Sequence, residues 1–329
     1  MAAYKDIIGH EHIIEYMQNC MKENKVSHAY IFNGEQGSGK KLLADAFSAA
    51  LQCEKKGISP CGECTSCKQA YGHNHPDIIW LTHEKPNSIG VDDIREGLNN
   101  DIAIKPYKGP FKIYIVDEAE KMTIQAQNAL LKTIEEPPAY GIILLLTTNE
   151  KMMLPTILSR CVSLSLRPVK DNLIKEFLMK QYEIPDYQAD ISVAFAQGNV
   201  GKAIRLATNE EFNKIKDAAI QLMKYLEEMQ IYEIIDAVKH IADYKMSVND
   251  YLDIIMIWYR DVLLFKATRD ANSLIFKNEI NYINKFADKS SYQNIEAIIH
   301  AIEKTKVRLN ANVNFDLAME LLLLTIKEN

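Results

Sequence analysis

The chain has 329 residues, of which 47% are hydrophobic and 25% are charged, a composition that is ordinary for a globular protein of two or three domains. The formal net charge of −6 argues against a broad nucleic-acid-binding surface, although it leaves room for a local basic patch. No apolar run approaches the roughly 18 residues of a membrane span, and the first residues do not follow a signal-peptide pattern, so we expect a cytoplasmic protein with no membrane contact.

A glycine-rich loop follows the first predicted strand. Residues 29–32 are an apolar run that predicts a strand, and residues 42–51 place apolar side chains at helical spacing. The sequence between them fits G-x-x-x-x-G-K, in which glycines let backbone N–H groups face phosphate oxygens and the lysine reaches the outer phosphates. The loop therefore predicts a nucleotide site formed by Gly34, Gly37, Ser38, Gly39 and Lys40.

The loop departs from this pattern at the next residue. Lys41 replaces the serine or threonine whose hydroxyl group normally binds Mg²⁺. An ammonium group at this place can neutralise phosphate charge, but it cannot orient a metal ion for catalysis. Binding of ATP or ADP therefore stays open, while we expect neither Mg²⁺ nor efficient hydrolysis at this site.

Four cysteines follow in a loop, and their spacing is typical of a metal site. Three of them form C-x2-C-x2-C, and the fourth lies eight positions before the first of these. Thiolates spaced in this way can surround one Zn²⁺ ion, and a cytoplasmic setting disfavours disulfides. The alternatives are unrelated loop thiols, or replacement of a ligand by the nearby His73 or His75. We expect a closed, structural Zn²⁺ site made by Cys53, Cys61, Cys64 and Cys67.

Two acidic residues end the strand that is predicted at 111–116. An apolar strand that runs into Asp117 and Glu118 is a weak signal alone, but it becomes strong in a chain that also has a phosphate loop. Asp117 would bind Mg²⁺ or its water, and Glu118 would polarise an attacking water molecule. The buried strand predicted at 141–146 leads to Thr148, at the edge of a parallel sheet where a nucleotide phosphate would lie.

Strands and helices alternate up to residue 167, which predicts an α/β fold with a parallel sheet and helices on both of its faces. Beyond that point the pattern is all-α, with amphipathic helices such as 251–267 and 315–327. The other elements expected in the α/β part are helices at 6–25, 123–136 (with Thr123 as N-cap) and 154–160, a helix within 87–101 that begins near Val91 or Asp92, and strands at 77–81 and 162–166.

With these elements in place, the chain resembles the AAA+ clamp-loader family. The segments that carry the resemblance are HAYIFNGEQGSGKK (28–41), the four-cysteine insertion, HPD (75–77), IGVDDIRE (89–96), KIYIVDEAEKM (112–122), NALLKTIEEPP (128–138) and LPTILSRC (154–161), with a less specific likeness at WYRDVLL (258–264) and 310–323. The resemblance implies an AAA+ P-loop core at 1–167 with a zinc-binding insertion at 53–67, a small helical lid at 168–208, and a helical collar at 209–329 that joins subunits.

The resemblance also implies an activity and roles for single residues. The family belongs to the DNA polymerase III holoenzyme, a DNA-directed DNA polymerase, and uses ATP to place a ring-shaped sliding clamp on primed DNA. Arg160, between Ser159 and Cys161, would be an arginine finger that acts in trans in a neighbouring ATPase subunit. Ile8 would contact the adenine base, and Gly201 stands where ATPase subunits carry a sensor arginine.

Lys41 and Gly201 together favour a stator subunit that has little or no ATPase activity of its own. Its implied partners are the ATPase (tau/gamma) subunit and the delta subunit, with the sliding clamp and primed DNA reached through the complex. Two alternatives stay open. One is a competent ATPase, either tau/gamma-like or standalone, and the other is a zinc-containing nucleic-acid-binding module that uses the cysteine loop.

Overall fold

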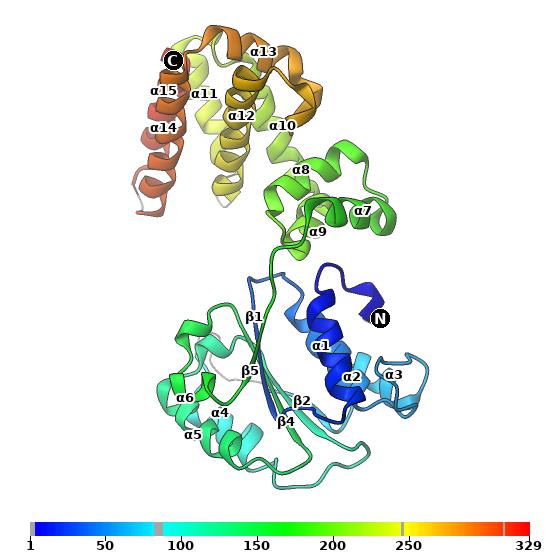
Figure 1. Cartoon of the computed structure of the whole chain (residues 1–329). Coiled ribbons are helices and arrows are strands. Elements are labelled where there is room, and N and C mark those ends of the chain that lie inside the picture. Colours follow the sequence, from blue (N-terminus) through cyan, green and yellow to red (C-terminus); the bar gives the residue numbers. More distant parts are fainter. Residues whose placement is uncertain (1–3, 82–87, 245–246, 312) are drawn as a thin grey trace. The chain divides into compact units, whose positions relative to one another are not determined.

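The computed structural model describes residues 4–81, 88–244, 247–311 and 313–329 (Figure 1). The chain divides into two compact units, one formed by residues 1–176 with 197–202 and the other by residues 177–196 with 203–329. The first three residues of the predicted core, residue 87 in the segment predicted to carry a helix, and residue 312 in the C-terminal resemblance lie outside the described residues. The domain boundaries expected at 167 and 208 stay predictions.

A five-stranded parallel sheet forms the centre of the first unit. Its strand order is β2-β3-β4-β1-β5, and every neighbouring pair is parallel. All five predicted strands are confirmed, with bounds of Ala29–Asn33 (β1), Ile78–Trp80 (β2), Lys112–Val116 (β3), Gly141–Thr147 (β4) and Val162–Ser165 (β5). The chain leaves β1 for the far edge, returns through β3 and β4, and then crosses over β1 to β5. The carboxyl ends of β1, β3 and β4 therefore meet at one edge of the sheet, where α/β proteins bind ligands.

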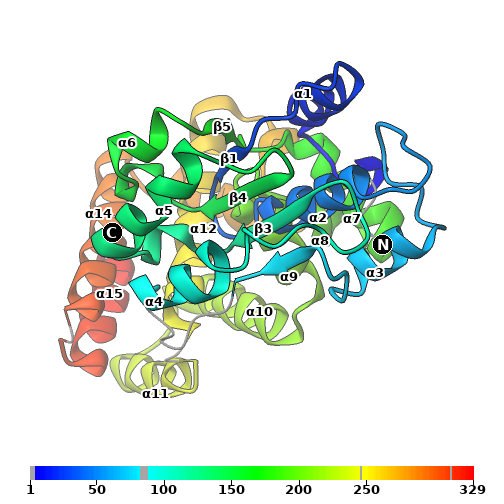
Figure 2. The ribbon, with the colours of Figure 1, turned by 90° about the horizontal axis from the view of Figure 1, so that it is seen from below.

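Helices cover both faces of this sheet, as predicted (Figure 1). One face carries α1 (Glu11–Lys22), α2 (Lys40–Leu51) and α3 (Thr65–Tyr71), and the other carries α4 (Val91–Ile94), α5 (Ile124–Glu135) and α6 (Pro155–Leu158). Successive side chains of β1 point to opposite faces, so that Tyr30 packs edge-on against Phe47 of α2 while Ile31 joins the core that contains Leu130 of α5. Figure 2 shows the same sheet turned by 90°, with β3 beside β4.

One predicted helix of the first unit is interrupted, and another begins where it was predicted. The helix expected over 6–25 is a 3₁₀ turn, η1 (Tyr4–Asp6), followed by α1, because Gly9 between them has a φ of +77°. The helix expected to begin near Val91 or Asp92 begins at Val91, as α4, and continues as a π-helical turn, η2 (Arg95–Asn99). The N-cap role of Thr123 is confirmed, since its hydroxyl group accepts the N–H of Ala126 at 3.1 Å.

From Asp171 onward the described residues are helical and contain no strand. The helices are α7 (Asp171–Tyr182), α8 (Asp186–Ala196), α9 (Val200–Thr208), α10 (Glu210–Tyr225), α11 (Ile231–Ala242), α12 (Val248–Thr268), α13 (Ile280–Lys289), α14 (Tyr292–Asn310) and α15 (Phe315–Glu328). The second unit has its own core, in which Trp258 of α12 is fully buried and meets Phe286 of α13 edge-on. None of the helices that the structure describes combines the length and apolarity needed to cross a membrane.

Candidate functional site

The phosphate loop turns from β1 into α2. The N–H of Gly34 donates to the carbonyl oxygen of Thr147 at 3.1 Å, which fixes the start of the loop beside the end of β4. Gly37 and Gly39 have φ values of +87° and +103°, in the left-handed region that favours glycine, and Gly39 is the N-cap of α2. The first N–H groups of a helix have no partner within the helix, so this turn presents donors to an anion.

Lys40 lies buried at the start of α2. Its ammonium group donates to the carbonyl oxygens of Gly34 at 2.5 Å and Glu35 at 2.8 Å. Burial lowers the pKa of Lys40, although the charges of Glu120 and Asp117 oppose this shift. An ammonium group has three N–H donors, so these two contacts leave a third donor for a phosphate oxygen.

A cavity of about 540 Å³ opens beside the loop. Seven of the residues that the sequence predicts for the nucleotide site or for catalysis line it: Gly37, Gly39, Lys40, Lys41, Asp117, Glu118 and Thr148. The lining does not include Gly34, Ser38 or Ile8. Four lining residues were not singled out in the sequence, namely Gln36, Leu42, Glu120 and Leu146. The twelfth lining residue is Gly201, at the place where the resemblance puts the sensor arginine of ATPase subunits. The structure thus brings most of the predicted site together, while the role of each residue stays a prediction.

Lys41 and Asp117 form an ion pair inside this cavity. The distance from Lys41 Nζ to Asp117 Oδ2 is 2.6 Å, which is short even for a charge-assisted hydrogen bond. The carboxylate that would bind a metal ion therefore faces an ammonium group. This contact joins the start of α2 to the end of β3.

The other two acidic residues of the cavity have partners of their own. Glu118 has a φ of +50° and forms an ion pair with Lys121 at 2.7 Å. Glu120 accepts the hydroxyl hydrogen of Thr148 at 2.5 Å and the N–H of Thr148 at 3.2 Å. Burial opposes the charge on Glu120, but hydrogen bonds led by the Thr148 hydroxyl group outweigh burial and hold its pKa below the ordinary value.

The start of α9 and the residue before it contact the phosphate loop directly. The N–H of Gly201 donates to the carbonyl oxygen of Gly37 at 2.9 Å, and the side-chain amide of Asn199 donates to that of Gln36 at 2.8 Å. A Cβ atom on Gly201 would lie only 2.6 Å from the Gly37 oxygen. This close approach therefore requires glycine at 201. The same position is the one at which the resemblance expects a sensor arginine in ATPase subunits.

His10 fixes the loop from its other side. Its ring is buried, and its Nε2 lies 2.9 Å from the carbonyl oxygen of Ser38, so that Nε2 carries the hydrogen. Burial lowers the pKa of His10, which keeps the ring neutral. Ile8 is half-buried two residues before it, and the adenine contact predicted for Ile8 stays a prediction.

Arg160 lies outside the cavity of its own chain. It follows α6, and its side chain is 40% exposed and forms an ion pair with Glu135 of α5 at 3.0 Å. Its guanidinium group also donates to the carbonyl oxygen of Thr156 at 3.1 Å. Burial raises the pKa of the neighbouring Cys161 to about 12, so that this thiol is an apolar group rather than a nucleophile.

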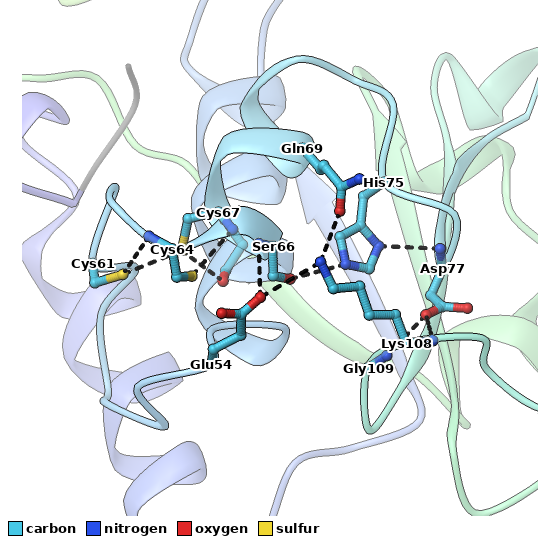
Figure 3. A network of polar contacts seen from close by, with 11 residues as sticks. Glu54, Cys61, Cys64, Ser66, Cys67, Gln69, His75, Asp77, Lys108 and Gly109 are labelled. Atoms are coloured by element: carbon cyan, nitrogen blue, oxygen red, sulfur yellow. Dashed lines mark hydrogen bonds and ion pairs between the residues drawn. The ribbon is translucent and has the colours of Figure 1, made fainter.

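The four predicted metal ligands converge. The Sγ atoms of Cys53, Cys61, Cys64 and Cys67 all lie within 4.8 Å of one another, and those of Cys61 and Cys67 are 3.9 Å apart (Figure 3). Zn–S bonds of about 2.3 Å at tetrahedral angles place sulfur atoms about 3.8 Å apart, so the cluster fits a zinc ion.

Backbone N–H groups donate hydrogen bonds to two of the cysteine sulfurs. The N–H of Cys64 donates to Cys61 Sγ, and the N–H of Cys67 donates to Cys64 Sγ, both at 3.4 Å. Hydrogen bonds from the N–H groups of Cys64 and Glu63 lower the pKa of Cys61 to about 6. Burial raises the pKa of Cys67 in the same cluster, so the backbone favours the thiolate, the form that binds zinc, at Cys61 and not at every ligand.

A buried polar network connects the cysteine insertion to the sheet (Figure 3). Ser66 of α3 lies 2.9 Å from Nε2 of His75, whose Nδ1 accepts the N–H of Asp77 at 3.1 Å. The Asp77 carboxylate accepts three N–H groups of the loop before β3, those of Tyr107, Lys108 and Gly109. The insertion is thus anchored beyond its own cysteines, through residues that the resemblance marked but to which it gave no role.

Two family models match the chain. One, described as "DNA polymerase III, delta subunit", matches residues 9–170, and the other, described as "DNA polymerase III, delta subunit, C terminal", matches residues 216–328. The DNA polymerase III subunit delta' of Bacillus subtilis is 29% identical over 96% of this chain and 95% of its own length. The chain belongs to the delta-prime family of clamp-loader subunits.

Members of related families are also similar to this delta-prime family chain. The tau subunit of Bacillus subtilis DNA polymerase III is 28% identical over 84% of the chain, which spans about half, 53%, of that longer protein. A solved structure of a DNA polymerase III gamma subunit-related protein from Thermotoga maritima is 17% identical, covering 96% of this chain and 98% of its own, with a TM-score of 0.43.

Proposed function

We propose that this delta-prime family chain is the stator of a clamp loader and takes part in ATP-driven loading of a sliding clamp onto primed DNA. Its partners are the ATPase (tau/gamma) and delta subunits of a DNA polymerase III holoenzyme in the cytoplasm. It hydrolyses little or no ATP itself and donates Arg160 to the active site of the adjacent ATPase subunit. The proposal rests on the family match together with a nucleotide cavity in which an ammonium group pairs with the metal-binding aspartate.

The placement of Arg160 supports its role in trans. Its side chain is half-exposed, lies outside the cavity of its own chain, and contacts the carboxylate of Glu135, the carbonyl oxygen of Thr156 and the hydroxyl oxygen of Ser159. A phosphate can replace a surface carboxylate as the partner of a guanidinium group, because surface ion pairs are weak. Such a finger would stabilise charge in the transition state of phosphoryl transfer in the neighbouring subunit.

The test is Arg160→Ala in a loader reconstituted with its ATPase and delta subunits. Arginine fingers contribute roughly 10³–10⁵ in rate, so we expect the turnover of the adjacent site to collapse while size-exclusion chromatography shows an intact complex. Arg269→Ala is the matched control, because Arg269 is also half-exposed and pairs with a single acid, Asp288, at 2.7 Å. Unchanged ATP turnover in the Arg160 variant would refute the finger.

The main alternative is a competent ATPase, which the presence of both Asp117 and Glu118 favours. Against it stand the ion pairs that each of these acids makes with a lysine. Steady-state hydrolysis by the isolated chain separates the two functions. A turnover near about 1 s⁻¹, which is ordinary for an enzyme, contradicts the stator.

We also propose one structural Zn²⁺ ion, held by the four cysteines, and a bound adenine nucleotide in the cavity. The zinc ion is supported by the four cysteine Sγ atoms, which lie close enough together to share one ion. The nucleotide is supported by the glycine loop and by Lys40, which line the cavity.

A further inference from the structure

We infer that the cavity beside the phosphate loop takes a nucleoside diphosphate without any divalent cation, and that the ammonium group of Lys41 does the work of the metal ion. This inference rests on the nucleotide site of the proposed function and names the ligand of that site. It concerns binding alone and involves no covalent step.

The donor set at this place does not fit Mg²⁺. This ion requires oxygen ligands at about 2.0–2.1 Å in a near-octahedral arrangement, supplied in phosphate loops by a hydroxyl group and an acidic residue. In this chain Lys41 stands in place of the residue with the hydroxyl group. The acidic residue is Asp117, whose Oδ2 lies 2.6 Å from the Lys41 ammonium group. A Mg²⁺ ion on that oxygen would lie against a like charge, so the ion and the lysine exclude each other.

Lys41 is well placed to act as a cation toward phosphate. It lies in the first turn of α2, next to Lys40, and both lysines line the cavity. The Lys41 side chain is 64% exposed, so its four-carbon stem can move between Asp117 and a ligand. A diphosphate would then meet two ammonium groups and the N–H groups of the loop, which together supply the positive charge that a metal ion usually contributes.

The acidic side of the cavity limits how many phosphates fit. Asp117, Glu118 and Glu120 all line it, and Glu120 is held in its charged form by Thr148. In a metal-dependent site, the cation bridges the two outer phosphates and neutralises their charge where they approach such acids. Without that cation a third phosphate would face the carboxylate of Glu120, and also that of Asp117 once Lys41 has turned from it to the ligand. The site should therefore prefer a diphosphate to a triphosphate.

The test is calorimetric titration of the purified full chain with ADP and with ATP, each in EDTA and in Mg²⁺. We expect the Kd of ADP to agree within about twofold between the two buffers, and ATP in EDTA to bind about tenfold more weakly than ADP, a difference typical of one added like-charge contact. Tightening of either nucleotide by about tenfold or more on addition of Mg²⁺ would overturn the inference.

Two substitutions at position 41 test two different effects: loss of the positive charge, and return of the hydroxyl group that phosphate loops normally carry there. Lys41→Met should weaken ADP binding about tenfold in both buffers, and Lys41→Thr should make binding depend on Mg²⁺. Lys25→Met is the control, since Lys25 is also exposed and pairs with an acid, Glu23, at 2.9 Å, and does not line the cavity. Its affinity should match that of the unmodified chain.

Wild-type affinity in Lys41→Met, or no binding of either nucleotide by the unmodified chain, contradicts the inference. The second outcome would mean that the Lys41–Asp117 pair closes the site. That outcome would also remove the bound nucleotide proposed above. Neither outcome touches the stator role or the arginine finger, because the Arg160 variant is read out by the turnover of a different subunit, so failure of the inference is distinguishable from failure of that function.

Discussion

His75 is a neutral imidazole held between two hydrogen bonds. Because Nδ1 accepts the N–H of Asp77, the ring hydrogen lies on Nε2 and is donated to the hydroxyl oxygen of Ser66. Burial lowers the pKa of His75; the charge of Asp77 opposes this shift and that of Lys108 adds to it. A proton on Nδ1 would break the bond to Asp77, so the folded protein resists protonation here.

This resistance makes stability depend on pH. The unfolded chain protonates His75 below about pH 6.5 while the folded chain does not, so His75 lowers the free energy of unfolding by about 1.4 kcal/mol per pH unit as the pH drops below 6.5, until its lower folded pKa is reached. His10, whose pKa is also lowered by burial, adds to the total slope. Denaturant unfolding between pH 7.5 and 5 measures the slope. His75→Gln should be less stable at pH 7.5 but should lose less stability on acidification. His240→Gln, at an exposed position, is the control. If stability falls with pH as steeply in His75→Gln as in His240→Gln, the assignment to His75 is contradicted.

Single residues of the cavity beside the phosphate loop were predictable where a motif gives them a fixed place. Lys41 and Asp117 were both identified in the sequence, but their ion pair needed coordinates, because it depends on the reach of two side chains. Glu120 was missed, since the motif ends at Glu118. The left-handed backbone at Glu118 turns the chain there, and Glu120 also lines the cavity.

At the scale of elements, the cysteine insertion was the most predictable part of the site. Its ligands are close in sequence, so their spacing alone limits the loop to conformations that bring the sulfurs together. The network from Ser66 through His75 to Asp77 was not predictable in this way. It depends on how α3 packs against the end of the neighbouring strand β2.

Loss of one zinc ligand should release the ion and destabilise the insertion. For Cys64→Ser we expect metal content, measured by elemental analysis, to fall from one zinc per chain to near zero. The unfolding free energy should fall with it, because metal binding contributes directly to folding in such sites. Cys20→Ser is the matched control, since Cys20 is also a free cysteine but lies outside the cluster. A purified chain without zinc would contradict the site itself.

Element bounds were least predictable where a distant residue decides them. The interruption before α1 depends on Gly9, at which a Cβ atom would lie 2.4 Å from Cγ1 of Val169. Those two residues are far apart in sequence, so no local pattern carries this information. The apolar periodicity around α1 reads as one longer helix for that reason.

At the scale of the whole molecule, the parallel α/β class was predictable but the strand order was not. Alternation of strands and helices indicates a parallel sheet, yet it does not say which strands are neighbours. The order β2-β3-β4-β1-β5 follows from the packing of crossovers and places the phosphate loop beside the ends of β3 and β4. The two compact units have separate cores, and each contains one of the two tryptophans, Trp80 and Trp258.

The tryptophans can report on the two units separately. We expect a zinc chelator to lower the thermal midpoint of the fluorescence transition in Trp258→Phe, where Trp80 near His73 is the remaining reporter, because the cysteine insertion belongs to that unit. The same chelator should leave the transition of Trp80→Phe unchanged. Equal shifts in both variants would show that the units unfold as one, which contradicts the expectation.

The contact between Gly201 and Gly37 limits which single substitutions this chain can accept. The main chain at 201 lies against the phosphate loop, so that any Cβ atom would lie 2.6 Å from the Gly37 oxygen. Gly201→Arg alone would therefore break this contact and would still leave Lys41 facing Asp117. The two positions are thus coupled, because a change at one of them does not remove the obstacle at the other.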